Sequence, residues 1–203
     1  MSCIFYIGIS LLLTNVMEEV LCMERHGLNG QIEDENYCLD LIDQLDEKWV
    51  KYIDNLPLKF AIKECISGIN RLERQKLRSC AQMNIRVNVG DVCFIDFGQA
   101  YIHEAGYQHF GVVLKLVNNK AFVVPMTSNE TTYMYAEDVS RHQYGKNHLH
   151  QMGWIEGLNK RSVCFVNDCK FINTARIIDV KGHIPPTSPI FLELKDRVME
   201  CIS

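Results

Sequence analysis

Residues that can transfer protons lie near hydroxyl-bearing residues in the middle of the chain. A polar loop, 98–109, contains Glu104 and ends at His109, and a strand-like run further on ends in Thr127 and Ser128. An imidazole has an ordinary pKa of about 6.5, so His109 can accept or donate a proton at neutral pH. Cleaving RNA without a metal requires a base for the 2′-hydroxyl, donors that stabilise charge on phosphorus, and a proton for the leaving 5′-oxygen. The residue types therefore predict metal-free phosphodiester chemistry, in which Glu104 orients His109 or serves as the opposite proton-transfer partner.

Runs with strand character surround these residues. Residues 92–97 alternate in apolar character, and 111–117 and 121–126 are dense in β-branched and aromatic residues, which is typical of buried strands. Asn118 and Asn119 between the last two runs predict a tight turn, because Asn tolerates positive φ. Further strands are expected at 152–156, 162–167 and 169–172, with at least one more strand or turn within 175–183.

The rest of the second half indicates the fold class. Residues 130–151 are polar and rich in Tyr and His, which predicts a long loop or a short helix. Ser188 is suited to cap a terminal helix that Pro189 opens. Short strands joined by uneven loops and closed by one helix favour a small barrel, an α+β fold, over a doubly wound sheet.

Two amphipathic helices precede this β-rich part. Apolar residues recur at helical spacing over 33–53 and again over 58–77, where Pro57 stands at a position that a helix tolerates. Residues 33–54 carry eight acidic side chains against two lysines, whereas 58–78 carries six basic side chains against two glutamates. We therefore expect an α-helical extension over 1–84, with a helical hairpin at about 33–80, followed by a barrel domain with its C-terminal helix at 85–203.

Composition favours a globular cytoplasmic protein. The 203 residues are 47% apolar and 23% charged, and the formal net charge of -4 argues against a protein that coats nucleic acid by charge alone. The nine cysteines are odd in number and include no C-x-x-C pair, which indicates reduced thiols. The apolar segment 3–16 is short of the about 20 residues of a spanning helix. It is interpreted as a packed helix, or as preceding a true start at Met17 or Met23, and no membrane role is expected.

A resemblance to a known family rests on motifs found in order along the chain. They are Gly-Asp-Val at 90–92, Asp-Phe-Gly at 96–98, Glu104 and Gly106, the strand 111–114, Val-Val-Pro-Met-Thr-Ser-Asn at 123–129, Leu-Asn-Lys-x-Ser-Val at 158–163, and then Asp168, Lys170, Ile172, Thr174 and Arg176. Over residues 88–184 the chain resembles the MazF/PemK/Kid toxins of type II toxin-antitoxin systems. The resemblance implies an SH3-like barrel that cleaves single-stranded RNA without a metal or other cofactor, forms a homodimer and is neutralised by an antitoxin protein.

The resemblance also assigns site residues. The family's catalytic threonine corresponds to Thr127, with Ser128 beside it, whereas His109 and Phe110 stand where the family has Arg and Pro. A histidine can carry out either proton-transfer step at neutral pH, whereas an arginine cannot act as a base. His109 therefore keeps RNA cleavage possible while changing which residue performs each step. The expected catalytic residues are His109, Thr127, Glu104 and Ser128, and the expected RNA-binding residues are Tyr107, Gln108, Asn129, Lys160, Arg161, Lys170 and Arg176.

Several alternatives stay open at this point. His109 can be a hydrogen-bonded rim histidine, 127–129 a strand cap, and the basic residues a solvated face. A zinc site at His142, His148 and His150 is disfavoured because no cysteine pair lies beside them. The main functional alternative is a non-catalytic binding module, like the gyrase-poisoning relatives of the family. Two roles are open for the acidic helix expected at 33–53. It either covers the basic groove of its own barrel, as an antitoxin would, or has a packing or dimerisation role.

Overall fold

The computed structural model describes residues 35–137 and 145–203, and it divides the chain into two compact units, Met1–Asp54 and Asn55–Ser203. The described part of the first unit is one helix, α2, at Glu35–Asp54, which agrees with the helix expected at 33–53. The second unit begins with α3 at Leu58–Arg74. Helix α3 thus belongs to the same unit as the sheet, while the helical hairpin stays a prediction.

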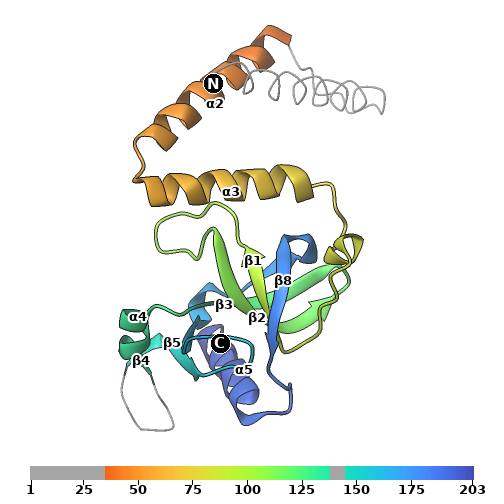
Figure 1. The fold of residues 1–203 in the computed structure, drawn as a ribbon, viewed down its shortest axis with the longest axis vertical. Coiled ribbons are helices and arrows are strands. Elements are labelled where there is room, and N and C mark those ends of the chain that lie inside the picture. Colours follow the sequence, from red (N-terminus) through yellow and green to blue (C-terminus); the bar gives the residue numbers. More distant parts are fainter. Residues whose placement is uncertain (1–34, 138–144) are drawn as a thin grey trace. The chain divides into compact units, whose positions relative to one another are not determined.

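The second unit contains an eight-stranded sheet flanked by helices (Figure 1). Its strands run in the order β4-β5-β6-β3-β2-β1-β8, and β7 also pairs with β3. The strands are β1 Asp91–Asp96, β2 Gln108–Val117, β3 Lys120–Thr127, β4 Ala136–Glu137, β5 Lys146–Gly153, β6 Ser162–Phe165, β7 Lys170–Asn173 and β8 Ile177–His183. The remaining helices are α4 Glu130–Tyr135 and α5 Pro189–Cys201, with 3-10 turns at Cys80–Met83, Val166–Asp168 and Thr174–Arg176. All strand pairs except β4–β5 are antiparallel.

The α+β class, with an SH3-like sheet, preceding helices and a C-terminal helix, is the one the sequence predicted. The register between β1 and β2 and between β2 and β3 follows the expected hairpins, and Asn118 takes the positive φ of 53° that its turn requires. Two expectations were wrong. The segment 130–151 is not a long loop or a short helix, because it holds α4, β4 and most of β5. Of the strand expected at 152–156, only residues 152 and 153 belong to a strand, where they form the end of β5.

Two clusters of buried side chains hold the sheet together. On one face, valines from β1, β2 and β3 pack with Met126, Met152 and the apolar side of α5, where Phe191, Leu194 and Val198 are buried. On the other face, Ile95, Val113, Val123 and Ile177 form a second cluster. Burial of about ten such side chains at roughly 1.5–3 kcal/mol each is the main favourable term for this unit. The core thus rests on the strands and α5.

Helix α3 differs from α5 in how it contacts the sheet. In Figure 1 the two helices lie at opposite ends of the β-structure. The buried residues of α3 are polar, Glu64 and Ser67, whereas its apolar stripe of Leu58, Ile62 and Ile69 is exposed. Polar interactions therefore hold α3 to the barrel. None of the helices in the described residues is long and apolar enough to cross a membrane.

Candidate active site

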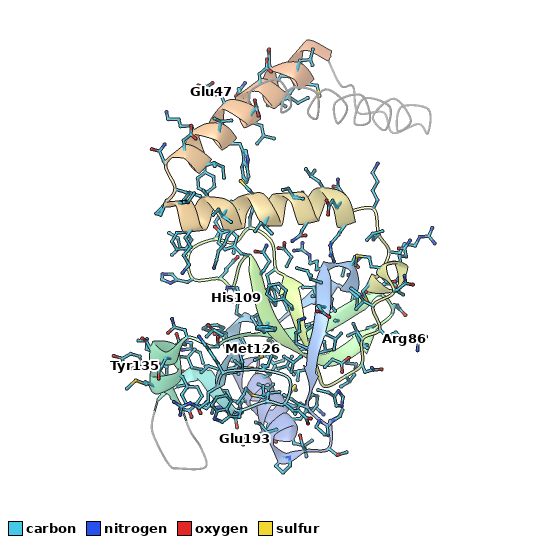
Figure 2. All side chains as sticks on the ribbon, viewed as in Figure 1. Glu47, Arg86, His109, Met126, Tyr135 and Glu193 are labelled. Carbon is cyan, nitrogen blue, oxygen red and sulfur yellow. The ribbon has the colours of Figure 1, made fainter. Side chains whose placement is uncertain are left out.

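His109 and Thr127 lie at the same end of neighbouring strands. Phe110 of β2 pairs with Met126 of β3 in an antiparallel register. Continuing this register by one position sets His109 opposite Thr127, and opposed residues of an antiparallel pair project from the same face with Cβ atoms about 5 Å apart. Both side chains are half-buried. Figure 2 shows His109 at the sheet end nearest α3, with Met126 deeper in the sheet. The structure thus brings the expected base and the expected hydroxyl group together.

The surroundings of His109 change its protonation. Burial disfavours the charged imidazolium, and the nearby positive charge of Lys63 on α3 disfavours it further, so the pKa of His109 is lowered from its ordinary value of 6.5. The imidazole is therefore neutral at pH 7. A neutral imidazole has one nitrogen free to accept a proton, which is the state that a general base needs.

Lys63 also approaches the neighbouring aromatic ring. Its ammonium lies 5.8 Å from the centroid of Tyr107, and the Tyr107 hydroxyl donates a hydrogen bond of 2.7 Å to Glu64 Oε1. Helix α3 therefore brings a positive charge close to His109. Lys63 is a site residue that sequence reasoning missed. The six basic residues of 58–78 were the available signal.

Asp96 connects α3 with the barrel. This buried carboxylate, at the end of β1, accepts hydrogen bonds from Ser67 Oγ at 2.7 Å and Asn70 Nδ2 at 2.7 Å, both on α3. It also accepts from Gln108 Nε2 and the Gly98 amide, each at 2.8 Å. Burial by itself raises the pKa of Asp96, but these four hydrogen bonds to the ionised form outweigh it and hold the pKa below its ordinary value of 3.8.

The loop between β1 and β2 closes on itself. The Tyr107 amide donates to the Gly98 carbonyl at 2.6 Å, and the Phe97 amide donates to the Tyr107 carbonyl at 2.8 Å. Glu104, which is exposed, accepts from the Tyr101 amide at 3.3 Å. Among the described residues this is the one hydrogen bond of the Glu104 carboxylate. The structure therefore places Glu104 in the loop's own turn and shows no contact between it and His109.

The remaining expected residues occupy different surroundings. Tyr107 and Gln108 donate to Glu64 and Asp96, as described above. Thr127 Oγ1 accepts from the Asn129 amide at 3.2 Å, and the Asn129 side chain caps α4 by accepting from the Thr132 amide at 3.0 Å. Ser128 is exposed in the same segment. Asn129 is therefore the N-cap of α4.

The four expected basic residues differ in their contacts. The Lys170 ammonium lies 3.3 Å from an Asp168 oxygen, and Arg176 Nη1 donates to the Phe97 carbonyl at 2.9 Å. The Arg161 guanidinium stacks 4.5 Å from the Tyr133 ring centroid, and Lys160 is exposed. Within the described residues no group of three or more His, Cys, Asp or Glu side chains is arranged to hold a metal ion, and His142 lies outside those residues.

The site is defined by a half-buried neutral imidazole beside a hydroxyl and an ammonium, at one end of a curved antiparallel sheet. No protein-family model and no curated protein matches the sequence. Solved structures similar to this chain are MazF-family toxins. MazF from Deinococcus radiodurans has a TM-score of 0.43 at 14% identity, covering 58% of this chain and 97% of that one.

Two mycobacterial structures are similar to the same part of the chain. An endoribonuclease in complex with its cognate antitoxin, from a mycobacterial species, has a TM-score of 0.39 at 10% identity, covering 58% of this chain and 95% of that one. The Mycobacterium tuberculosis toxin MazF-mt6 has a TM-score of 0.34 at 12% identity, covering 55% and 91%. At these identities the similarity is one of fold.

Proposed function

We propose that the unit formed by residues 55–203 is an endoribonuclease that cleaves single-stranded RNA without a metal, leaving a 2′,3′-cyclic phosphate and a 5′-hydroxyl. The observation that carries this proposal is the position of His109, opposite Thr127 in the β2–β3 register and close to Lys63 of α3. A base that is neutral at pH 7 serves the 2′-hydroxyl, and a hydroxyl donor and a cation stabilise the charge that develops on phosphorus.

Each of these residues has a role in the proposed reaction. Neutral His109 takes the proton of the 2′-hydroxyl as the 2′-oxygen forms its bond to phosphorus. The ammonium of Lys63 and the hydroxyl of Thr127 stabilise the negative charge on the pentacoordinate phosphorus. The bond to the 5′-oxygen then breaks, and that oxygen takes up a proton from water to become a hydroxyl. Glu104 keeps the loop in shape by accepting from the Tyr101 amide.

The test is a cleavage assay with the purified full chain and a labelled single-stranded RNA in the presence of a chelator. His109→Ala is expected to reduce the rate by at least about 100-fold, since positioned general bases contribute roughly 10²–10⁴-fold. His103→Asn is the matched control, because it removes an exposed histidine from the same loop at a positive φ of 74° that Asn tolerates. Products with a 5′-phosphate, or activity abolished by the chelator, would refute the mechanism.

One observation favours a second candidate, a non-catalytic barrel that binds nucleic acid or protein. Tyr107 and Gln108, both expected to contact RNA, already donate to Glu64 and Asp96. The same assay separates the two functions. Absence of cleavage of any RNA, together with retained binding of a partner, favours the binding module.

The proposal includes partners that the family resemblance implies, namely an antitoxin protein and a second copy of this chain in the cytoplasm. The exposed apolar stripe of α3 offers a surface of the helix-in-groove kind for a protein partner. Co-purification of this chain with the product of a neighbouring small acidic gene tests the antitoxin, and light scattering of the purified chain tests the dimer. A monomer at all concentrations would contradict the dimer.

A further inference from the structure

A cavity of about 500 Å³ lies between α3 and the end of β1, within the second unit. Its walls are one face of α3, the segment that leaves β1, and the 3-10 turn before β8. The lining includes Asn70, Arg71, Arg74, Gly98, Gln99 and Arg176. Cavities that hold small ligands in proteins usually measure about 300–1,000 Å³, so this one is large enough for a ligand of nucleotide size.

Positive charge dominates the lining. Three guanidinium groups, those of Arg71, Arg74 and Arg176, face one carboxylate, Asp96. That carboxylate already accepts four hydrogen bonds from Ser67, Asn70, Gln108 and Gly98. Its acceptor sites are used by the protein, so it does not neutralise the three arginines by pairing with them. The cavity therefore favours an anionic ligand.

Two of the arginines are held in place with donors to spare. Arg74 Nη1 donates to the carbonyls of Ala175 at 3.3 Å and Ile177 at 3.0 Å. Arg176 Nη1 donates to the Asp96 and Phe97 carbonyls at 3.4 and 2.9 Å. A guanidinium has five N–H groups, and among the described residues the Nε and Nη2 hydrogens of both arginines have no acceptor.

The third arginine is free to bind. Arg71 is exposed on the same face of α3, and its guanidinium has no hydrogen bond or ion pair within residues 35–137 and 145–203. Gly98 completes the arrangement, because a Cβ there would lie 2.9 Å from Arg176 Nη1, and its φ of +85° is one that other residues rarely adopt. The glycine thus leaves the space in which the Arg176 guanidinium sits.

We propose that this cavity is a phosphate-binding site, in which Arg71, Arg74 and Arg176 hold the phosphate of a ligand about the size of a nucleotide. Guanidinium groups bind phosphate with two parallel charge-assisted hydrogen bonds, which is why arginine is common at such sites. The side-chain amides of Gln75, Gln99 and Asn173 line the same cavity and can contact the sugar or base. The site stands apart from the proposed ribonuclease reaction, and it does not depend on that reaction being correct.

The phosphate can come from a free nucleotide or from a nucleic-acid strand, and the test distinguishes these sources. Calorimetric titrations of the full chain use inorganic phosphate, 5′-AMP and a 5′-phosphorylated deoxytetranucleotide, which has no 2′-hydroxyl and so is not a substrate. Arg71→Gln is expected to weaken binding about tenfold, the loss of one hydrogen bond to a charged group. Lys59→Gln is the matched control, since it removes one positive charge from an exposed position of α3 that does not line the cavity.

Each outcome decides the proposal. Binding of 5′-AMP that weakens in Arg71→Gln but not in Lys59→Gln supports a nucleotide site. Binding of the tetranucleotide alone, with the same dependence on Arg71, supports the same phosphate site and assigns the phosphate to a nucleic-acid strand. Equal loss in both variants shows unspecific charge attraction and overturns the site. Absence of binding for all three probes up to about 10 mM also overturns it.

Discussion

Helix α3 donates two side-chain hydrogen bonds to Asp96, one from a hydroxyl and one from an amide. Removing both donors is expected to detach this helix while leaving the sheet folded. Ser67 and Asn70 each donate to the Asp96 carboxylate at 2.7 Å. A hydrogen bond to a charged group contributes about 1.5–3 kcal/mol, and these two share one acceptor, so their joint loss is expected to cost about 3 kcal/mol. This corresponds to roughly a 100-fold rise in the fraction of molecules with α3 detached.

The double variant Ser67→Ala, Asn70→Ala makes this test, with hydrogen exchange as the assay. Because α3 buries polar rather than apolar side chains, its amides are expected to exchange about 100-fold faster, while those of β1–β3 keep their rates. Cys65→Ala is the matched control, since it changes an exposed position on the same helix. Equal acceleration across the sheet, or none in α3, would show that these hydrogen bonds do not hold the helix locally.

The same contacts predict how stability depends on pH. The pKa of Asp96 is lowered in the folded state, so its contribution is fully present above the unfolded value of about 3.9 and is lost as pH falls through the folded pKa. Without the donors of Ser67 and Asn70 this pKa rises, because two of the hydrogen bonds that lower it are gone. The gap between the unfolded and the folded pKa of Asp96 is then smaller, so urea unfolding of the double variant is expected to show a smaller loss of stability on acidification below about pH 5 than the unmodified chain.

The activity of the double variant shows whether α3 contributes to catalysis or covers the site. If α3 supplies Lys63 to the site, as proposed above, the double variant cleaves RNA more slowly. A rise in activity would refute this and identify α3 as a cover over the site. Deleting residues 1–54 tests the separate hypothesis that the acidic helix inhibits the barrel, for which a rise in activity is expected.

Three further predictions follow from single contacts. Lys63→Met is expected to raise the pKa of His109, so the limb of the pH–rate profile on which activity rises moves to higher pH; an unmoved limb would contradict the role of His109 as the base. Gly157→Ala is expected to cost at least about 1–3 kcal/mol of unfolding free energy, measured by urea denaturation, because its φ is +88° and a Cβ would lie 2.0 Å from the Lys181 carbonyl oxygen. Burial raises the pKa of Cys93 to about 12, so this thiol is expected to resist a thiol reagent at pH 8 in the folded protein while exposed cysteines react.

Local sequence patterns determined much of the architecture. Alternating and β-branched runs located β1, β2 and β3, helical spacing located α2 and α3, and Ser188 with Pro189 located the start of α5. Turn chemistry placed Asn118 at the hairpin. Strand β5 was not predicted, because its segment is polar and rich in histidine. The strand is stabilised there by pairing with β6 rather than by its own β-propensity.

The candidate site was only partly visible in the sequence. His109 lies near the start of β2 and Thr127 lies at the end of β3. These two strands are consecutive in the chain and form a hairpin, so the sequence could place the two residues at the same end of it. Gln108 and Tyr107 were expected to contact RNA, but they bond to Asp96 and Glu64. The hydrogen-bond partner of a side chain is a group that lies within about 3 Å of it and can be distant in sequence. A local sequence pattern does not predict which group that is.

The sequence by itself determined that α3 is amphipathic and basic, but only the tertiary structure decided which face meets the barrel. An amphipathic helix is expected to bury its apolar stripe. Here the end of the sheet presents a buried carboxylate and a tyrosine hydroxyl, and polar groups buried without partners are costly, so the side of α3 that carries Glu64, Ser67 and Asn70 faces them. That orientation brings Lys63 to His109 and puts Arg71 and Arg74 on the cavity wall, and it leaves the apolar stripe exposed.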